Sequence, residues 1–418
     1  MDKQSTDTIQ EGLTPPSNPT ATVQPSSDVN ALASSPNILS HFADMLEHCG
    51  VVGEKNIGML IYLALTSRVL HRPVSLAVKG PSSGGKSFIT QQVLRFFPES
   101  AYYALTAMSD KSLVYSEEDL RNRFLVLFEA ESLKSDMASY LIRSLLSEGR
   151  IRYETVVSSS SGLSSQFIEK EGPTGLLITT TATSLHAENE TRFLSLTVQD
   201  TPEQTRAILR SMARSKPAEI DLSIWVDLQS WIDTANHNVT IPFAEELANL
   251  SIPASVRFRR DFRLILNLIK THAILHQENR ESNDEGYIMA QLEDYTEIYN
   301  LVAEIISEGL GVMVPDTVRQ TVDAVRLINE GKCSLTDETY GLTDCSPSKL
   351  IEVAQQLGID KSSASRRVNQ AIKLGYLVNS ETIKGKPMSL VIGDPLPEEQ
   401  RVIPSPNDLK RKLMQAEN

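Results

Sequence analysis

A glycine-rich segment between a short apolar run and a helical pattern carries the clearest chemistry in this sequence. It consists of Gly80, Pro81, Ser82, Ser83, Gly84, Gly85, Lys86 and Ser87, and it fits the pattern GxxxxGK[ST] at every position. In this pattern backbone N–H groups turn toward phosphate oxygens, and the following helix adds the positive end of its dipole. The lysine reaches the β- and γ-phosphates, and the Ser87 hydroxyl binds Mg²⁺. The segment therefore predicts a site for ATP and Mg²⁺.

Carboxylates follow a second apolar run, residues 124–128. Glu129 comes directly after the run and Glu131 two positions later. Ligands of open α/β sheets bind at the carboxyl ends of the strands, so we expect Glu129 beside the phosphate loop. There it could hold Mg²⁺ or polarise the attacking water. The division of roles between the two glutamates stays open, because Phe128 stands where aspartate is the commoner residue.

A third apolar run, residues 176–180, ends in hydroxyl side chains. Thr181 could sense the γ-phosphate or hold the lytic water. Threonine also favours strands, so any single Thr in this run could serve the sheet alone.

Strands and helices must alternate to position these residues. The predicted strands are residues 74–78, 101–105, 124–128, 151–157, 176–181 and 193–198. Strands that alternate with helical patterns predict an α/β fold with a mostly parallel sheet. Two helices are expected before the sheet, at about 37–49 and 54–70. Helical patterns follow it at about 202–214, 222–235, 243–250, 258–277, 290–308 and 316–329.

The order of phosphate loop, acidic strand, hairpin, Thr strand and Arg-Phe pair resembles the AAA+ ATPases. It is most similar to the branch that contains minichromosome maintenance helicases and the primase-associated helicases of phages and plasmids. The resemblance implies that Arg192 is a finger arginine that reaches the ATP of a neighbouring subunit. Alternatively, Arg192 is a surface residue paired with Glu188 or Glu190.

The resemblance also implies two features outside the phosphate site. A hairpin before the Thr strand touches DNA in this branch; here residues 151–157 and 167–171 would be its strands, with Arg150 and Arg152 at its base. Arg260 best matches a second sensor arginine in a helical lid, and Arg259 fits nearly as well. His272 and His276 have zinc-protease spacing on the same lid helix, but the required Glu is absent, so we expect them to be ordinary lid residues.

The last ordered part, residues 330–395, predicts a winged helix. Two helices are followed by two short strands, and residues 346–395 hold seven Lys or Arg against four Asp or Glu. Arg366, Arg367, Lys384 and Lys386 could contact DNA phosphates without reading sequence. A winged helix used for protein contacts is the alternative.

The predicted organisation has six parts. These are a disordered tail (1–36), an N-terminal helical segment (37–72), the P-loop AAA+ core (73–200), the helical lid (201–329), the winged helix (330–395) and a flexible tail (396–418). A net charge of −13 over 418 residues excludes a wholly basic nucleic-acid coat protein. Three cysteines without a CxxC pair argue against disulfide scaffolds and zinc modules. We expect a cytoplasmic protein with no membrane contact.

These observations predict an ATP-driven DNA motor, a ring-forming helicase of the replicative type. The expected partners are single-stranded or forked DNA, further copies of the chain in a hexamer, and a separate primase or other replication protein. The alternative is a helicase loader or DNA-binding regulator that uses ATP as a switch and does not translocate. A protein-remodelling ATPase is a third, remoter option.

Overall fold

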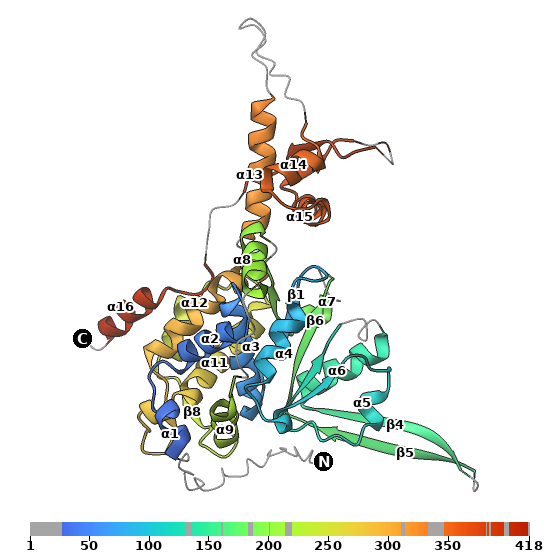
Figure 1. The fold of residues 1–418 in the computed structure, drawn as a ribbon. Coiled ribbons are helices and arrows are strands. Elements are labelled where there is room, and N and C mark those ends of the chain that lie inside the picture. The colour runs from blue at the N-terminus through green and yellow to red at the C-terminus, as the bar shows by residue number, and fades with distance from the viewer. Residues whose placement is uncertain are drawn as a thin grey trace, which may run out of the picture.

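The protein consists of an α/β body from which a long hairpin and a smaller C-terminal unit project (Figure 1). This computed structural model describes residues 27–129, 135–159, 162–182, 187–199, 201–213, 220–310, 314–332, 347–381, 383, 386–396 and 401–416. Within those ranges, no helix combines the length and the apolar character that crossing a bilayer requires.

Five strands form the central sheet in the order β2-β3-β6-β1-β7. They are β1 (Leu76–Lys79), β2 (Tyr102–Leu105), β3 (Arg123–Leu127), β6 (Thr174–Thr180) and β7 (Leu194–Thr197). Every neighbouring pair is parallel, which confirms the predicted sheet. Strand β6 is buried along its whole length because it lies between β3 and β1, so its threonines face the interior.

One face of the sheet shares a single core with the N-terminal helices and the lid. The elements on the N-terminal side are α1 (Ser27–Ala33), α2 (Ile38–His48), α3 (Lys55–Thr66), η1 (Ser67–Val69), α4 (Lys86–Leu94) and η2 (Glu99–Ala101). The prediction of disorder over residues 1–36 is wrong for α1, whose Val29 and Ala33 are fully buried in this core. Its apolar residues are few, but they lie on one side of the helix. Residues 1–26 lie outside the described ranges.

A second, smaller core covers the other face of the sheet. It contains α5 (Ser112–Tyr115), α6 (Asp136–Glu148) and the base of an antiparallel hairpin, β4 (Arg150–Ser159) and β5 (Gly162–Glu171). The strands of this hairpin run further than predicted. Its outer part exposes Val156, Leu163 and Phe167.

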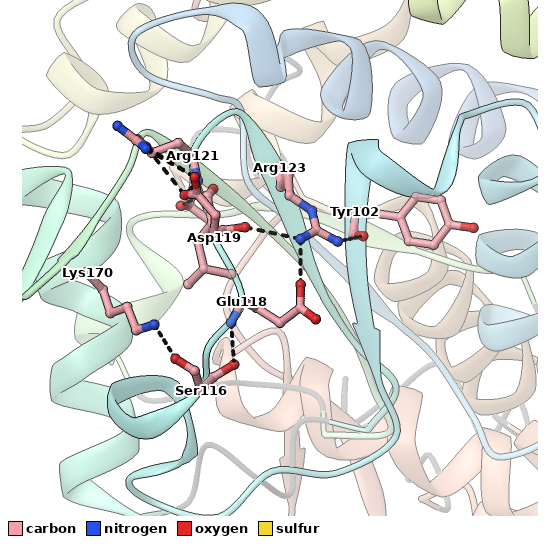
Figure 2. A network of polar contacts seen from close by, with 9 residues as sticks. Tyr102, Ser116, Glu118, Asp119, Arg121, Arg123 and Lys170 are labelled. Carbon is pink, nitrogen blue, oxygen red and sulfur yellow. Dashed lines mark hydrogen bonds and ion pairs between the residues drawn. The ribbon is translucent and has the colours of Figure 1, made fainter.

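Polar contacts fasten the base of the hairpin to the loop before β3 (Figure 2). The Lys170 ammonium donates to the backbone carbonyl of Ser116. Arg123 donates to the Glu118 carboxylate at 2.7 Å and to the Tyr102 carbonyl at 2.8 Å. The Lys170 contact thus joins the base of the hairpin to the segment that leads into β3.

Helices dominate the chain after the sheet, as the sequence predicts. They are α8 (Pro202–Met212), α9 (Ser223–Ile232), α10 (Ala244–Leu250), α11 (Phe258–Leu275), η4 (Gln277–Asn279) and α12 (Leu292–Gly309), while the short α7 (Ala187–Glu190) lies before β7, the last strand of the sheet. A short parallel strand pair, β8 (Val239–Thr240) and β9 (Ile288–Met289), was not predicted. The fully buried Arg68 joins the lid to the N-terminal helices by donating to the Gln229 side chain and pairing with Asp233 at 2.7 Å.

The two lid histidines belong to a buried polar network. His272 Nδ1 lies 2.6 Å from an oxygen of Asp294, which Arg280 also binds at 2.7 Å. The His276 ring stacks on His272 with centroids 4.1 Å apart, and its Nδ1 contacts the His272 carbonyl at 2.9 Å. Both histidines therefore take part in contacts inside the lid, as expected of ordinary lid residues.

This network predicts a pH-dependent stability. Burial, followed by the charge of His272, lowers the pKa of His276 to about 3. Between that pH and about 6.5 the unfolded chain binds a proton that the folded chain does not, so stability falls as the pH drops. From pH 7.5 to pH 5 we expect His276 to contribute a loss of about 2 kcal/mol.

Urea unfolding of the wild-type protein and the His276→Phe variant at both pH values measures this contribution. The pH difference in the free energy of unfolding should shrink in the variant and persist in the matched exposed variant His71→Asn. Equal pH dependence in all three proteins would rule out a neutral, buried His276.

The C-terminal unit has its own core of valines and leucines. It consists of α13 (Asp316–Gly331), α14 (Leu350–Leu357), α15 (Lys361–Lys373) and the antiparallel pair β10 (Leu377–Asn379) and β11 (Leu390–Ile392). Helix α13 was assigned to the lid, but Val318, Val322 and Val325 pack into this second core instead. The unit therefore begins near residue 314.

The chain then returns from this unit to the lid. Val402, Ile403 and Leu409 are buried in the main core, and α16 (Pro406–Ala416) lies against α10 and α12. The Tyr295 hydroxyl donates to the Pro404 carbonyl. The predicted flexible tail is thus wrong for residues 401–416, because a few apolar residues in a polar segment are enough to dock it. The C-terminal unit is consequently tethered to the lid at both ends.

Candidate functional site

The phosphate loop leaves β1 at the carboxyl end of the sheet and enters α4. The Gly80 N–H donates to the Thr180 carbonyl, which fixes the loop between β1 and β6. Ser83 and Gly85 have positive φ values of 64° and 83°, and Gly85 caps α4. Left-handed residues of this kind turn successive N–H groups inward, and the N-terminus of α4 adds a partial positive charge.

Close packing explains the first and second glycines of this loop. A side-chain carbon at Gly80 would lie 2.2 Å from a methyl of Val198, and one at Gly84 would lie 3.0 Å from the Pro81 carbonyl oxygen. The Lys86 ammonium lies inside the same turn, where it donates to the carbonyls of Pro81 at 2.7 Å and Gly80 at 3.2 Å. Burial lowers the pKa of Lys86, while the nearby Glu129 carboxylate raises it. These features suit a nucleoside triphosphate.

Glu129 reaches this site on a constrained backbone. It has a φ of 83°, which is rare for a residue with a side chain, and its N–H donates to the Thr179 hydroxyl at 3.1 Å. Such conformations cluster at functional sites because the surroundings must hold them. The Glu129 carboxylate is exposed and acts electrostatically on Lys86. Glu129 and the half-buried Ser87 are the residues that would hold Mg²⁺, which would neutralise charge on the transferred phosphoryl group. Glu131 lies outside the described residues.

Thr179, rather than Thr181, is the hydroxyl that the structure ties to this site. Strand β6 ends at Thr180, and Thr181 follows with an exposed side chain. Thr179 is 1% exposed and holds Glu129 through the hydrogen bond described above. A role for Thr181 as a sensor stays a prediction. The alternation of a strand indicates which threonines share a face, but it does not indicate which one meets Glu129.

Arg192 and the phosphate loop lie at opposite ends of the sheet strands. The carboxyl ends of the strands form the edge with the phosphate loop, and the amino ends form the edge with Arg192. Strand β7 runs parallel to β1 with Leu194 beside Leu76, so Arg192 precedes the amino end of its strand, whereas Gly80 follows the carboxyl end of its own. Arg192 donates to the Ser147 hydroxyl at 2.9 Å and to the Glu188 carbonyl at 2.5 Å. The alternative pairing with a Glu188 or Glu190 carboxylate is not formed, since these bind Arg143 and Lys79.

Two more arginines gather around Arg192. Arg260 donates to the Thr191 hydroxyl at 2.6 Å, and Arg143 pairs with Glu188. Burial, then the charges of Arg260 and Arg143, lower the pKa of Arg192. Arg260, the predicted second sensor, therefore lies at the same end of the sheet strands as Arg192. Arg143 carries no sequence signal, because it is a basic residue of an amphipathic helix without a motif around it.

A buried ion pair connects the phosphate-loop strand to the segment before Arg192. Lys79 is 7% exposed, and its ammonium binds the Glu190 carboxylate. The sequence feature that points to this ion pair is a lysine at the end of an otherwise apolar strand, directly before Gly80. A buried charge needs a partner, and Glu190 satisfies that need.

Two of the predicted DNA contacts lie beside a carboxylate of the same hairpin. Arg152 binds Glu169 at 2.6 Å, and Arg150 lies 4.0 Å from the same carboxylate. Arg367 is only 7% exposed and faces the core of its unit, so its predicted contact with DNA is wrong for this conformation. Helical periodicity explains the error, because Arg367 shares a side of α15 with Ala364, Val368 and Ala371. Arg366 is half-buried and Lys386 exposed, while Lys384 lies outside the described residues.

Residues 27–224 match the family model described as "MTBMA_p00010 P-loop domain". No curated protein matches the chain. Among solved structures, the chain is similar to a full-length MCM homolog from Methanopyrus kandleri, with 15% identity over 68% of this chain and a TM-score of 0.44. The match covers 63% of that protein. The family match identifies a P-loop domain that includes the phosphate loop, Glu129 and Arg192.

Proposed function

We propose that this protein is an ATPase of the AAA+ type in which each active site is completed by a neighbouring copy. The observation that carries the proposal is the separation of Lys86 and Arg192 to opposite edges of one parallel sheet. A chain cannot bring both to the same phosphate. Two copies placed edge to edge can, and Arg192 then stabilises charge on the transferring phosphoryl group.

The roles of the residues follow from their positions. The phosphate loop and Lys86 bind the β- and γ-phosphates, while Glu129 orients or polarises the attacking water. Ser87, together with Glu129, would hold Mg²⁺. Arg260, which donates to the Thr191 hydroxyl, enlarges the positive field around Arg192, and this field favours docking against an anionic nucleotide.

Mixing two inactive variants tests this arrangement. When each variant is assayed alone, Lys86→Ala and Arg192→Ala should both hydrolyse ATP slowly. The rate of Arg192→Ala should be about a thousandfold below the wild-type rate. In an equimolar mixture about a quarter of random interfaces join an intact Lys86 to an intact Arg192, so a corresponding share of activity should return. Arg95→Ala, which removes an exposed arginine that binds Gln92, is the control. Mixed assemblies that form but recover no activity would contradict the shared site.

We further propose that ATP hydrolysis drives movement along DNA as in a helicase. The C-terminal unit supports this, because its three helices followed by an antiparallel strand pair are the elements expected of a winged helix, a variant of the helix-turn-helix that can bind DNA. The projecting hairpin supports it as well, since it stands where the AAA+ resemblance implies a DNA contact. Sustained ATP-dependent displacement of a strand from forked DNA is the expected result.

A helicase loader or DNA-binding regulator is the second candidate. The pairing of Arg150 and Arg152 with Glu169 favours this candidate, because an arginine whose charge is balanced by a carboxylate binds DNA phosphates more weakly. ATP-dependent DNA binding without strand displacement, from protein that hydrolyses ATP, would favour this candidate over the motor.

A further inference from the structure

The turn between α14 and α15 of the C-terminal unit lies against the body close to the phosphate loop. Val198 packs on Gly80, and its N–H donates to the Lys79 carbonyl at 2.9 Å. Four residues later Pro202 begins α8, and a side-chain carbon at Gly358 would lie 3.7 Å from the Pro202 ring. Gly358 ends α14 and leads into α15. A short chain of contacts thus joins the phosphate loop to the start of α15, and Figure 1 shows α15 beside that end of the sheet.

Arg366 occupies the middle of the α15 face that turns away from its own core. By helical spacing this face also carries Ser362, Asn369, Gln370 and Lys373. Those four residues are exposed, whereas Arg366 at their centre is half-buried. Its guanidinium donates to the Ser363 hydroxyl at 2.8 Å. Arg366 is thus the least exposed of these five residues, and its guanidinium is held against its own helix.

Arg366 and Lys86 are close enough for their charges to interact. Burial is the main cause that lowers the pKa of Lys86, and the positive charge of Arg366 lowers it further, against the opposing effect of Glu129. Two cations that converge beside a phosphate cradle repel one another unless an anion lies between them. A nucleotide phosphate supplies that anion, and guanidinium groups bind phosphate oxygens in a bidentate manner.

We propose that Arg366 contacts the phosphates of the nucleotide bound in the phosphate loop of its own chain. The C-terminal unit then senses whether the site holds a nucleotide. Arg366, which the sequence assigned to DNA, becomes part of the ATP site. This inference rests on the proposed function, because it requires that the phosphate loop binds ATP.

Binding measurements on the full chain test the inference. A fluorescent ATP analogue with Mg²⁺ is titrated into the wild-type protein and into the Arg366→Ala, Arg366→Gln and Lys373→Ala variants. Both Arg366 variants should bind about tenfold more weakly, as expected for one lost charge-assisted contact. Lys373→Ala removes one positive charge from the same helix face and should bind as the wild-type protein does. Circular dichroism melting checks that the variants fold, and Arg366→Gln replaces a half-buried side chain with another polar one.

The Lys86→Ala variant separates the two hypotheses. If it loses ATP binding while both Arg366 variants match the wild type, the role of Arg366 is refuted and the phosphate loop stands. An equal loss in Lys373→Ala would also refute it, because general charge would then explain the effect. If Lys86→Ala itself binds ATP normally, the proposed function fails, and this inference fails with it.

Discussion

Replacing Lys86 with alanine is expected to lower the rate of ATP hydrolysis at least about a hundredfold, since a preorganised charge at a transferring phosphoryl group supplies several kcal/mol. Lys86 is 6% exposed and lies within the turn of the phosphate loop, with its ammonium on the Pro81 and Gly80 carbonyls. Among the described residues, no other cation donates to those two carbonyls, so we expect no neighbouring side chain to replace the Lys86 ammonium. Steady-state release of inorganic phosphate, measured over a range of ATP concentrations, gives the effect.

The control for this prediction is Lys55→Ala. Lys55 lies at the surface and binds Asp44 and Glu47, so its loss should leave hydrolysis within about twofold of the wild-type rate. Thermal melting shows whether each variant folds. A folded Lys86→Ala protein with wild-type turnover would remove the assignment of the phosphate loop as the catalytic site.

Removing residues 401–418 is expected to lower the free energy of unfolding by about 5 kcal/mol, because three apolar side chains leave the main core. Val402 and Leu409 are fully buried and Ile403 is 2% exposed. The truncation also deprives the Ile252 N–H of the Val402 carbonyl. Urea unfolding of the truncated and full-length chains measures the difference.

Single substitutions separate the docking of the tail from a general effect of truncation. Leu409→Ala should cost about 2–4 kcal/mol, whereas Lys410→Ala on the exposed side of α16 should change stability little. Equal effects of the two substitutions would mean that the tail does not pack through Leu409.

The parts of the site that follow one another in the chain could be predicted from the sequence. The strand, turn and helix around Gly80 depend on local preferences, namely glycine at positive φ and an apolar run before it. Glu129 could be placed for a related reason, because the carboxyl ends of parallel strands meet at one edge. The strands of the central sheet and the long helices after it were predicted to within a few residues for the same local reasons, whereas α1, β8, β9 and α16 were not predicted.

Contacts between distant segments could not be predicted in this way. Glu190 appears in the sequence as one of several acidic residues, and only the fold brings it to the buried Lys79. The polar composition of residues 401–416 hides the few side chains that dock them. Arg366 lies on a helix whose charges are typical of DNA binding, and its position near Lys86 depends on how two units pack. Local preferences carry no information about such packing.

The separation of Lys86 and Arg192 has a consequence for how copies can join. In a two-fold dimer, residue i of one copy contacts residue j of the other and the reverse, so such a dimer completes two sites only if Lys86 and Arg192 share one self-complementary patch. Head-to-tail contacts instead complete one site at each interface, and an open row of copies leaves one phosphate loop at its end without an arginine. Every site of such a row is complete only when the row closes on itself, so in a head-to-tail assembly the fraction of working sites reports on closure.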